Sequence, residues 1–120
     1  MTATTKVNYK TKFMVIVELA NLKAPEAIQK LKQAHNEVAS FPPKSILLVI
    51  DVTNTEVNKE VITEMTEFST KNASYVKLSA LVGANSLIRI ASYNISNSAG
   101  RKTITFKSRT EAMDWLAKQP

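Results

Sequence analysis

The sequence predicts an α/β fold made of four successive strand–helix units, with a mainly parallel sheet covered by helices on both faces. Two uninterrupted apolar runs support this fold class: SILLVID at residues 45–51 and LSALVG at residues 78–83. Apolar runs without a polar face are typical of interior strands in a parallel sheet. A helical pattern follows each run, and right-handed crossovers wind such units into one sheet.

The length of 120 residues fits one domain. We expect residues 1–12 to be a loose N-terminal arm or an edge strand, and residues 13–120 to form a single domain. The absence of cysteine excludes disulfides, thiol catalysis and cysteine metal sites, and it fits a reducing cytosol. The N-terminus has no apolar core of a secretory signal, and no apolar run is long enough to cross a bilayer. We therefore expect a cytoplasmic protein.

The net charge of +6 is unevenly distributed. Residues 1–50 and 75–120 are basic, whereas residues 51–74 are acidic. A basic chain can attract acidic partners, including nucleic acid and anionic membranes, but a net charge of this size also serves solubility. We favour solubility and expect no nucleic-acid partner.

The first half of the chain contains two of the strand–helix units. Residues 13–20 are rich in β-branched side chains and predict the first strand. The following helix starts near Pro25, ends at Phe41-Pro42-Pro43 and has one apolar face, formed by Ile28, Leu31, His35 and Val38. Residues 45–52 predict the central strand, and Asn58 is the expected N-cap of a second helix. The apolar stripe of that helix comprises Val61, Ile62, Met65 and Phe68.

The second half continues the pattern with a third strand at residues 78–84. We expect a third helix that is capped by Asn85 or Ser86, runs to about Ser98 and stops at Gly100. Residues 102–106 alternate polar and apolar side chains, as an edge strand does. Ser108 and Glu111 have the spacing of a capping box, which predicts the last helix at residues 111–118.

Four segments together resemble the STAS domain, the anti-anti-sigma-factor-like (SpoIIAA-like) fold of small, largely uncharacterised bacterial proteins: ILLVIDVTNT, YVKLSALVGANSLIRI, GRKTITF and SRTEAMDWL. The resemblance implies a protein-interaction switch, and some related domains hold nucleotides or lipids. In sigma-factor antagonists, a serine at the start of the helix after the central strand is phosphorylated. The nearest positions here are Asn58 and Lys59, while Thr53 and Thr55 lie earlier in the loop.

Candidate ligand-binding residues lie where two parallel strands end, which is where open α/β sheets place their ligands. Asp51 ends the central strand, although we favour a role in capping the following turn through backbone N–H groups. A helix that begins after the next strand exposes N–H groups to an anion, although ordinary capping explains these residues too. The candidates for a small anion or a lipid are Asp51, Thr53, Thr55, Gly83, Asn85, Ser86 and Arg89.

The chain lacks an obvious catalytic or metal-binding set. His35 is the single histidine, it shares the apolar helix face, and no carboxylate stands four residues away to orient it. No cluster of His, Cys and carboxylates suggests a metal. The glycine count of two argues against a nucleotide cradle. We therefore expect a non-enzymatic protein without a cofactor.

Two surface features complete the sequence-based expectations. The third helix is apolar on more than one stripe, which suggests a partner or homodimer interface formed by Ile90, Tyr93 and Ile95. The basic cluster around the edge strand predicts a solvated edge: Arg101, Lys102, Lys107 and Arg109. The leading hypothesis is a non-catalytic interaction or regulatory module, and the alternative is a carrier or sensor for a lipid or small anion.

Overall fold

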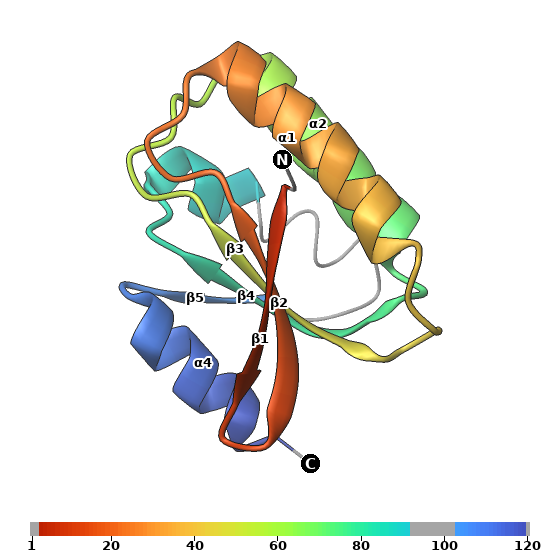
Figure 1. Cartoon of the computed structure of the whole chain (residues 1–120). Coiled ribbons are helices and arrows are strands. Elements are labelled where there is room, and N and C mark those ends of the chain that lie inside the picture. Colours follow the sequence, from red (N-terminus) through yellow and green to blue (C-terminus); the bar gives the residue numbers. More distant parts are fainter. Residues whose placement is uncertain (1–2, 92–102, 120) are drawn as a thin grey trace.

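The computed structural model describes residues 3–91 and 103–119 (Figure 1). The elements are β1 (Thr4–Tyr9), β2 (Lys12–Glu18), α1 (Ala24–Val38), β3 (Ile46–Asp51), α2 (Lys59–Asn72), β4 (Val76–Val82), β5 (Thr103–Phe106) and α4 (Arg109–Ala117). Residues 86–91 are also helical. These elements confirm the predicted α/β fold class.

One sheet of five strands has the order β1-β2-β3-β4-β5. The pairs from β2 to β5 are parallel, whereas β1 pairs with β2 antiparallel. β3 is the central strand, and the run at residues 45–51 lies beside the run at residues 78–83, as predicted. The edge strand was one of two expectations for residues 1–12, and the structure shows it at Thr4–Tyr9.

Helices cover both faces of the sheet, and the two faces carry separate hydrophobic clusters (Figure 1). The first cluster joins α1, α2 and Ile88 to one face of β2, β3 and β4. Its buried centre includes Val15, Leu31, Leu48 and Phe68. The second cluster joins α4 to the other face and includes Met14, Val49, Ala112 and Leu116.

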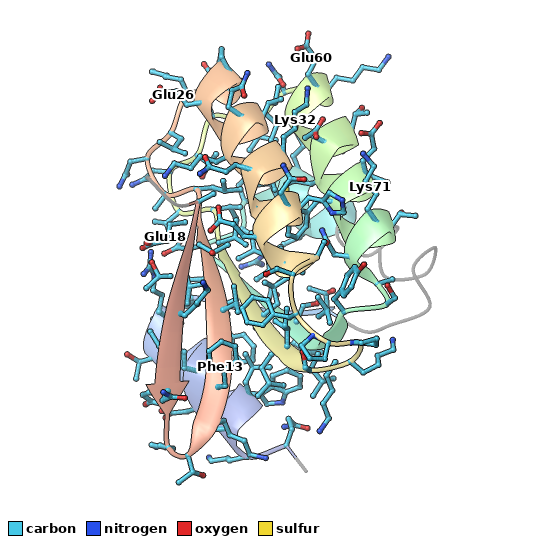
Figure 2. The ribbon with its side chains drawn as sticks, turned by 45° about the vertical axis from the view of Figure 1, so that its right-hand side comes forward. Phe13, Glu18, Glu26, Lys32, Glu60 and Lys71 are labelled. Atoms are coloured by element: carbon cyan, nitrogen blue, oxygen red, sulfur yellow. The ribbon has the colours of Figure 1, made fainter. Side chains whose placement is uncertain are left out.

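The faces of α1 and α2 that point away from the sheet carry charged side chains. Figure 2 shows Glu26 and Lys32 on α1 and Glu60 and Lys71 on α2 pointing away from the sheet, and all four are exposed. Glu67 and Lys71 form the predicted pair one turn apart, with 3.9 Å between Oε2 and Nζ.

The predicted helix starts are largely confirmed. Asn58 caps α2 by accepting a hydrogen bond from the Val61 N–H at 2.9 Å. Ser108 caps α4 by accepting one from the Glu111 N–H at 3.2 Å, and its hydroxyl lies 3.3 Å from the Glu111 carboxylate. The predicted end of the third helix, at residues 92–100, lies outside the described residues.

Candidate functional site

Asp51 ends β3 with its carboxylate almost fully buried, at 6% exposure for the residue. Its Oδ1 accepts hydrogen bonds from the backbone N–H of Thr53 at 3.0 Å and from the Thr53 hydroxyl at 2.7 Å. The turn after the central strand is therefore closed by Asp51 in the way the sequence suggested.

The other oxygen of Asp51 accepts a hydrogen bond from Arg109 Nε at 2.7 Å. Arg109 is the first residue of α4, and its Nη2 also lies 2.8 Å from Oε1 of Glu18 at the end of β2. Glu18 in turn accepts a hydrogen bond from the hydroxyl of Thr5, on β1, at 2.6 Å. We call Asp51, Arg109, Glu18, Thr53 and Thr5 the strand-end cluster. It connects β1, β2 and β3 to the start of α4.

The charges of the strand-end cluster stabilise one another. Burial alone would raise the pKa of Asp51, but hydrogen bonds from Thr53 and Arg109 outweigh it and lower that pKa. The Thr5 hydroxyl and then Arg109 lower the pKa of Glu18. Burial would lower the pKa of Arg109, but its two carboxylate partners raise it instead. All three groups are therefore held in their charged forms at neutral pH.

Arg109 corrects one prediction. The sequence placed it in a solvated basic edge, but its guanidinium bridges two carboxylates, one of them buried. Arg109 and Asp51 are separated by 58 residues, so no local pattern brings them together. The remaining signal was weak: a lone arginine at the start of a predicted helix, on the sheet edge where Asp51 ends its strand.

The predicted residue Gly83 lies directly against Thr53. Its φ is +76°, and a Cβ at this position would clash with Thr53 Oγ1 and lie 2.8 Å from Thr53 Cα. Glycine alone fits this close approach with this backbone conformation. The structure thus brings Asp51, Thr53 and Gly83 together, but it fills the space between them.

The two threonines in the loop before the phosphorylated position of sigma-factor antagonists both use their hydroxyls internally. The Thr53 hydroxyl donates to Asp51, and the Thr55 hydroxyl donates to the Leu19 carbonyl at 2.7 Å. Thr55 is also buried, at 8% exposure. Phosphorylation of either side chain would break a hydrogen bond that holds the loop after β3.

The remaining predicted residues lie on helical residues 86–91 or just before them. Asn85 is the N-cap, because its Oδ1 accepts a hydrogen bond from the Ile88 N–H at 2.9 Å. Ser86 and Arg89 are exposed. Ile88 faces the core at 1% exposure, whereas Leu87 and Ile90 are 50% and 65% exposed. Of the predicted interface, Ile90 is exposed, and Tyr93 and Ile95 lie outside the described residues.

His35 lies between α1 and α2 and contacts a residue that the sequence did not single out. Its Nδ1 lies 2.9 Å from Oδ1 of Asn72, which is fully buried. The Asn72 amide N–H₂ donates to the Phe68 carbonyl at 2.8 Å, so its oxygen faces the imidazole. Nδ1 must therefore carry the proton in this hydrogen bond. The geometry supports the predicted packing role of His35.

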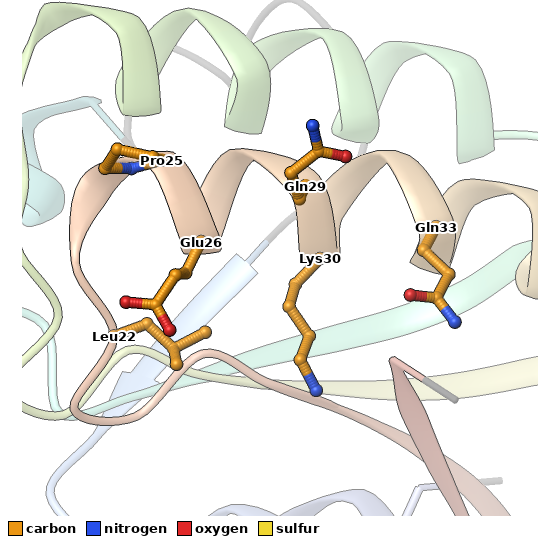
Figure 3. A pocket seen from close by; sticks show the side chains of 6 residues that line it. All are labelled: Leu22, Pro25, Glu26, Gln29, Lys30 and Gln33. Carbon is orange, nitrogen blue, oxygen red and sulfur yellow. The ribbon is translucent and has the colours of Figure 1, made fainter. Parts of the chain in front are cut away.

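Two shallow depressions lie on the surface formed by α1 and α2. One lies between the two helices and is lined by Leu31, Lys32, His35, Asn36, Glu64, Glu67, Phe68 and Lys71. The other runs along α1 and is lined by Leu22, Pro25, Glu26, Gln29, Lys30 and Gln33 (Figure 3). In Figure 3, Glu26, Lys30 and Gln33 point to one side of α1 while Gln29 points to the other. Polar groups that diverge in this way do not define a common ligand position.

Within residues 3–91 and 103–119, no helix is long and apolar enough to cross a membrane. The same part of the chain holds no group of three or more His, Cys, Asp or Glu side chains placed to bind a metal ion.

Comparisons with known proteins agree with this architecture. No protein-family model matches the chain, and no curated protein matches it. Among solved structures, the chain is similar to an uncharacterised protein of the DUF3478 family, with a SpoIIAA-like fold, from Shewanella loihica PV-4. The TM-score is 0.66 at 16% sequence identity, and the match covers 95% of this chain and 92% of that one. This chain has a SpoIIAA-like fold. The resemblance predicted from the sequence is thereby confirmed at the level of the fold.

Proposed function

We propose that this protein is a non-catalytic, STAS-like regulatory module that acts through protein contact. The observation that carries the proposal is the exposed apolar pair Leu87 and Ile90, at 50% and 65% exposure, on a helix whose Ile88 is buried. Their spacing of three residues places both side chains on the same side of the helix. Contiguous exposed apolar patches mark interaction surfaces, and we infer that this pair belongs to such a patch.

The strand-end cluster supports a structural role for the residues beside this surface. Asp51 accepts hydrogen bonds from Thr53 and Arg109, which connect the carboxyl end of β3 to the start of α4. Helical residues 86–91 follow Gly83, which lies directly against Thr53. Fixing the start of this helix in advance would limit the entropy lost when a partner binds.

A second copy of the chain is the first partner to test. Sedimentation velocity at increasing concentration should show reversible self-association of the unmodified protein. Ile90→Glu combined with Leu87→Glu should give a monomer, because a buried carboxylate in an apolar contact is costly. Ser86→Glu combined with Arg89→Gln lowers the net charge by the same two units on the same helix without removing apolar surface, and it should leave association unchanged. A monomer that is indifferent to the double substitution would contradict a self-contact at this surface.

The alternative proposal is a carrier or sensor for a lipid or a small anion at the carboxyl ends of β3 and β4. Such a ligand would have to displace Arg109 from Asp51, or bind on the exposed side near Ser86 and Arg89. Native mass spectrometry of the purified protein distinguishes the two proposals. A co-purified ligand that is lost in Arg89→Ala would favour the carrier.

A further inference from the structure

The turn between β1 and β2 has an unfavourable backbone conformation for its residues. Tyr9 pairs with Lys12, which leaves Lys10 and Thr11 as a two-residue loop. Their φ angles are +48° and +71°. Two-residue hairpin loops with positive φ at both positions strongly prefer sequences such as Asn-Gly. Lysine has no such preference, and a β-branched threonine at positive φ is a true outlier.

All contacts of β1 with the rest of the molecule can be provided by another copy. β1 lies at the edge of the sheet and joins the remaining chain through this one turn. Its six residue pairs with β2 run from Thr4 with Val17 to Tyr9 with Lys12. Beyond the sheet, Glu37 accepts hydrogen bonds from the Ala3 and Thr4 N–H groups at 2.8 and 3.3 Å. Every one of these partners lies C-terminal to the turn.

We propose that β1 is an exchangeable strand, and that two copies of this chain form a dimer by trading β1 through an opened Lys10–Thr11 turn. In the dimer, each β1 pairs with β2 of the other copy in the same register. Lys10 and Thr11 become part of an extended segment with negative φ. The contacts of β1 are conserved in number, so relief of the turn is the net gain that offsets the cost of association.

One group of contacts opposes the exchange. The Tyr9 hydroxyl and Lys10 Nζ lie 2.6 and 2.8 Å from Oδ1 of Asp114 on α4. The Lys10 contact depends on the closed turn, because Lys10 itself is part of the hinge. The Tyr9 contact can be re-formed with Asp114 of the other copy, so the Lys10 contact is the one that favours the closed turn. The exchange depends on concentration because two chains associate, and on unfolding because β1 must first leave β2. The proposal concerns β1 and is independent of Leu87 and Ile90.

Refolding from denaturant at micromolar and millimolar concentration tests the exchange. The chain used carries Leu87→Glu and Ile90→Glu, so that the helical surface does not contribute to association. After dilution to the same final concentration, light scattering should show a dimer only in the sample refolded at the higher concentration. Refolding a mixture of ¹³C-labelled and unlabelled chains should give isotope-filtered contacts between Val7 of one copy and Met14 of the other, because these residues are register partners. Absence of a dimer, or a dimer without these contacts between copies, would overturn the proposal.

Turn variants provide the matched control. Lys10→Asn combined with Thr11→Gly fits the closed turn, because Asn and Gly adopt left-handed backbone conformations at lower cost than Lys and Thr. The closed monomer is then less strained, so the dimer fraction should fall at least about tenfold. Lys44→Gly relieves the same kind of strain, at φ +54°, in a loop that is no hinge for β1, and it should leave the dimer fraction unchanged. The dimer should persist in Ile90→Glu, which alters only the helical surface. Equal dimer fractions in the turn variant and the unmodified chain would refute the exchange.

Discussion

Arg109 lies between two carboxylates that differ greatly in exposure. The Asp51 side chain is 8% exposed and that of Glu18 is 43% exposed. A charge-assisted hydrogen bond to a buried carboxylate stabilises a protein by roughly 1.5–3 kcal/mol, whereas exposed ion pairs contribute little. The contribution of Arg109 to stability therefore comes mainly from Asp51.

Removing the guanidinium should destabilise the protein in a pH-dependent way. Arg109→Gln leaves Asp51 buried with Thr53 alone, so we expect a loss of about 2 kcal/mol at neutral pH. The pKa of Asp51 is lowered by folding, so its contribution is present above the ordinary value of 3.8 and is lost as the pH falls through the folded pKa. The difference between variant and unmodified protein should shrink under those acidic conditions. Urea unfolding of both proteins at neutral pH and well below pH 3.8 measures this difference in the free energy of unfolding.

Lys107→Gln is the matched control, because it removes an exposed cation from the same predicted basic cluster. It should change the free energy of unfolding by less than about 0.5 kcal/mol at either pH. A loss in Arg109→Gln that is the same at acidic and neutral pH would show that Arg109 acts through packing alone.

Residue-scale prediction from the sequence succeeded where the physics is local. The Asp51 turn and the Ser108–Glu111 cap depend on groups two or three residues apart, so their spacing is visible in the chain. The contacts of Asp51 with Arg109 and of His35 with Asn72 span 58 and 37 residues. Such pairs depend on strand order and helix packing, which a single sequence does not specify.

At the scale of elements, Glu37 holds the start of β1 against α1. Its carboxylate accepts hydrogen bonds from the Ala3 and Thr4 N–H groups and from the Thr4 hydroxyl, the last at 2.5 Å. A carboxylate near the C-terminal end of a helix is unfavourable for the helix dipole. Burial would raise the pKa of Glu37, but the bonds from Thr4 and Ala3 lower it. These bonds therefore outweigh both unfavourable effects.

Glu37→Gln should loosen the first residues of β1 without unfolding the sheet. An amide accepts weaker hydrogen bonds than a carboxylate, so exchange of the Ala3 and Thr4 amide hydrogens should accelerate about tenfold. The Val15 amide should be unaffected, because β2 has strands on both sides. Hydrogen exchange followed by NMR measures both. Glu26→Gln changes an exposed residue at the start of the same helix and is the control. Equal acceleration of amide exchange at Ala3 and Thr4 in this variant would contradict the role of Glu37 in holding β1.

Elements were predictable in proportion to how completely they are buried. β3 and the second half of β4 are covered on both faces and appear in the sequence as apolar runs, interrupted in β4 only by the small Ser79. β1 has four polar residues among six and a turn of lysine and threonine, so neither the strand pattern nor a turn signal was present. A tertiary contact, the pairing with β2, determines its structure.

At the scale of the whole molecule, the strand order determines how the helices are shared between the faces. Strands β2 to β5 follow one another in chain order and are parallel. Right-handed crossovers between successive neighbours place every connecting helix on the same face. The clusters agree, because α1, α2 and Ile88 share one core. Among the described elements, the second face is therefore left to α4, which follows the last strand and is not a crossover.

Leu116, in the last turn of α4, should therefore contribute more to stability than its position near the C-terminus suggests. Leu116 is 0% exposed and packs with Met14 and Val49 in the second cluster. Leu116→Ala should lower the free energy of unfolding by about 3 kcal/mol, since a fully buried leucine leaves a cavity that a short helix cannot close. Leu87→Ala removes the same atoms from an exposed site and should cost less than about 0.5 kcal/mol. Denaturant unfolding of both variants measures the difference. Equal effects would mean that α4 does not cover a core at all, and that the second face of the sheet is stabilised by the strands alone.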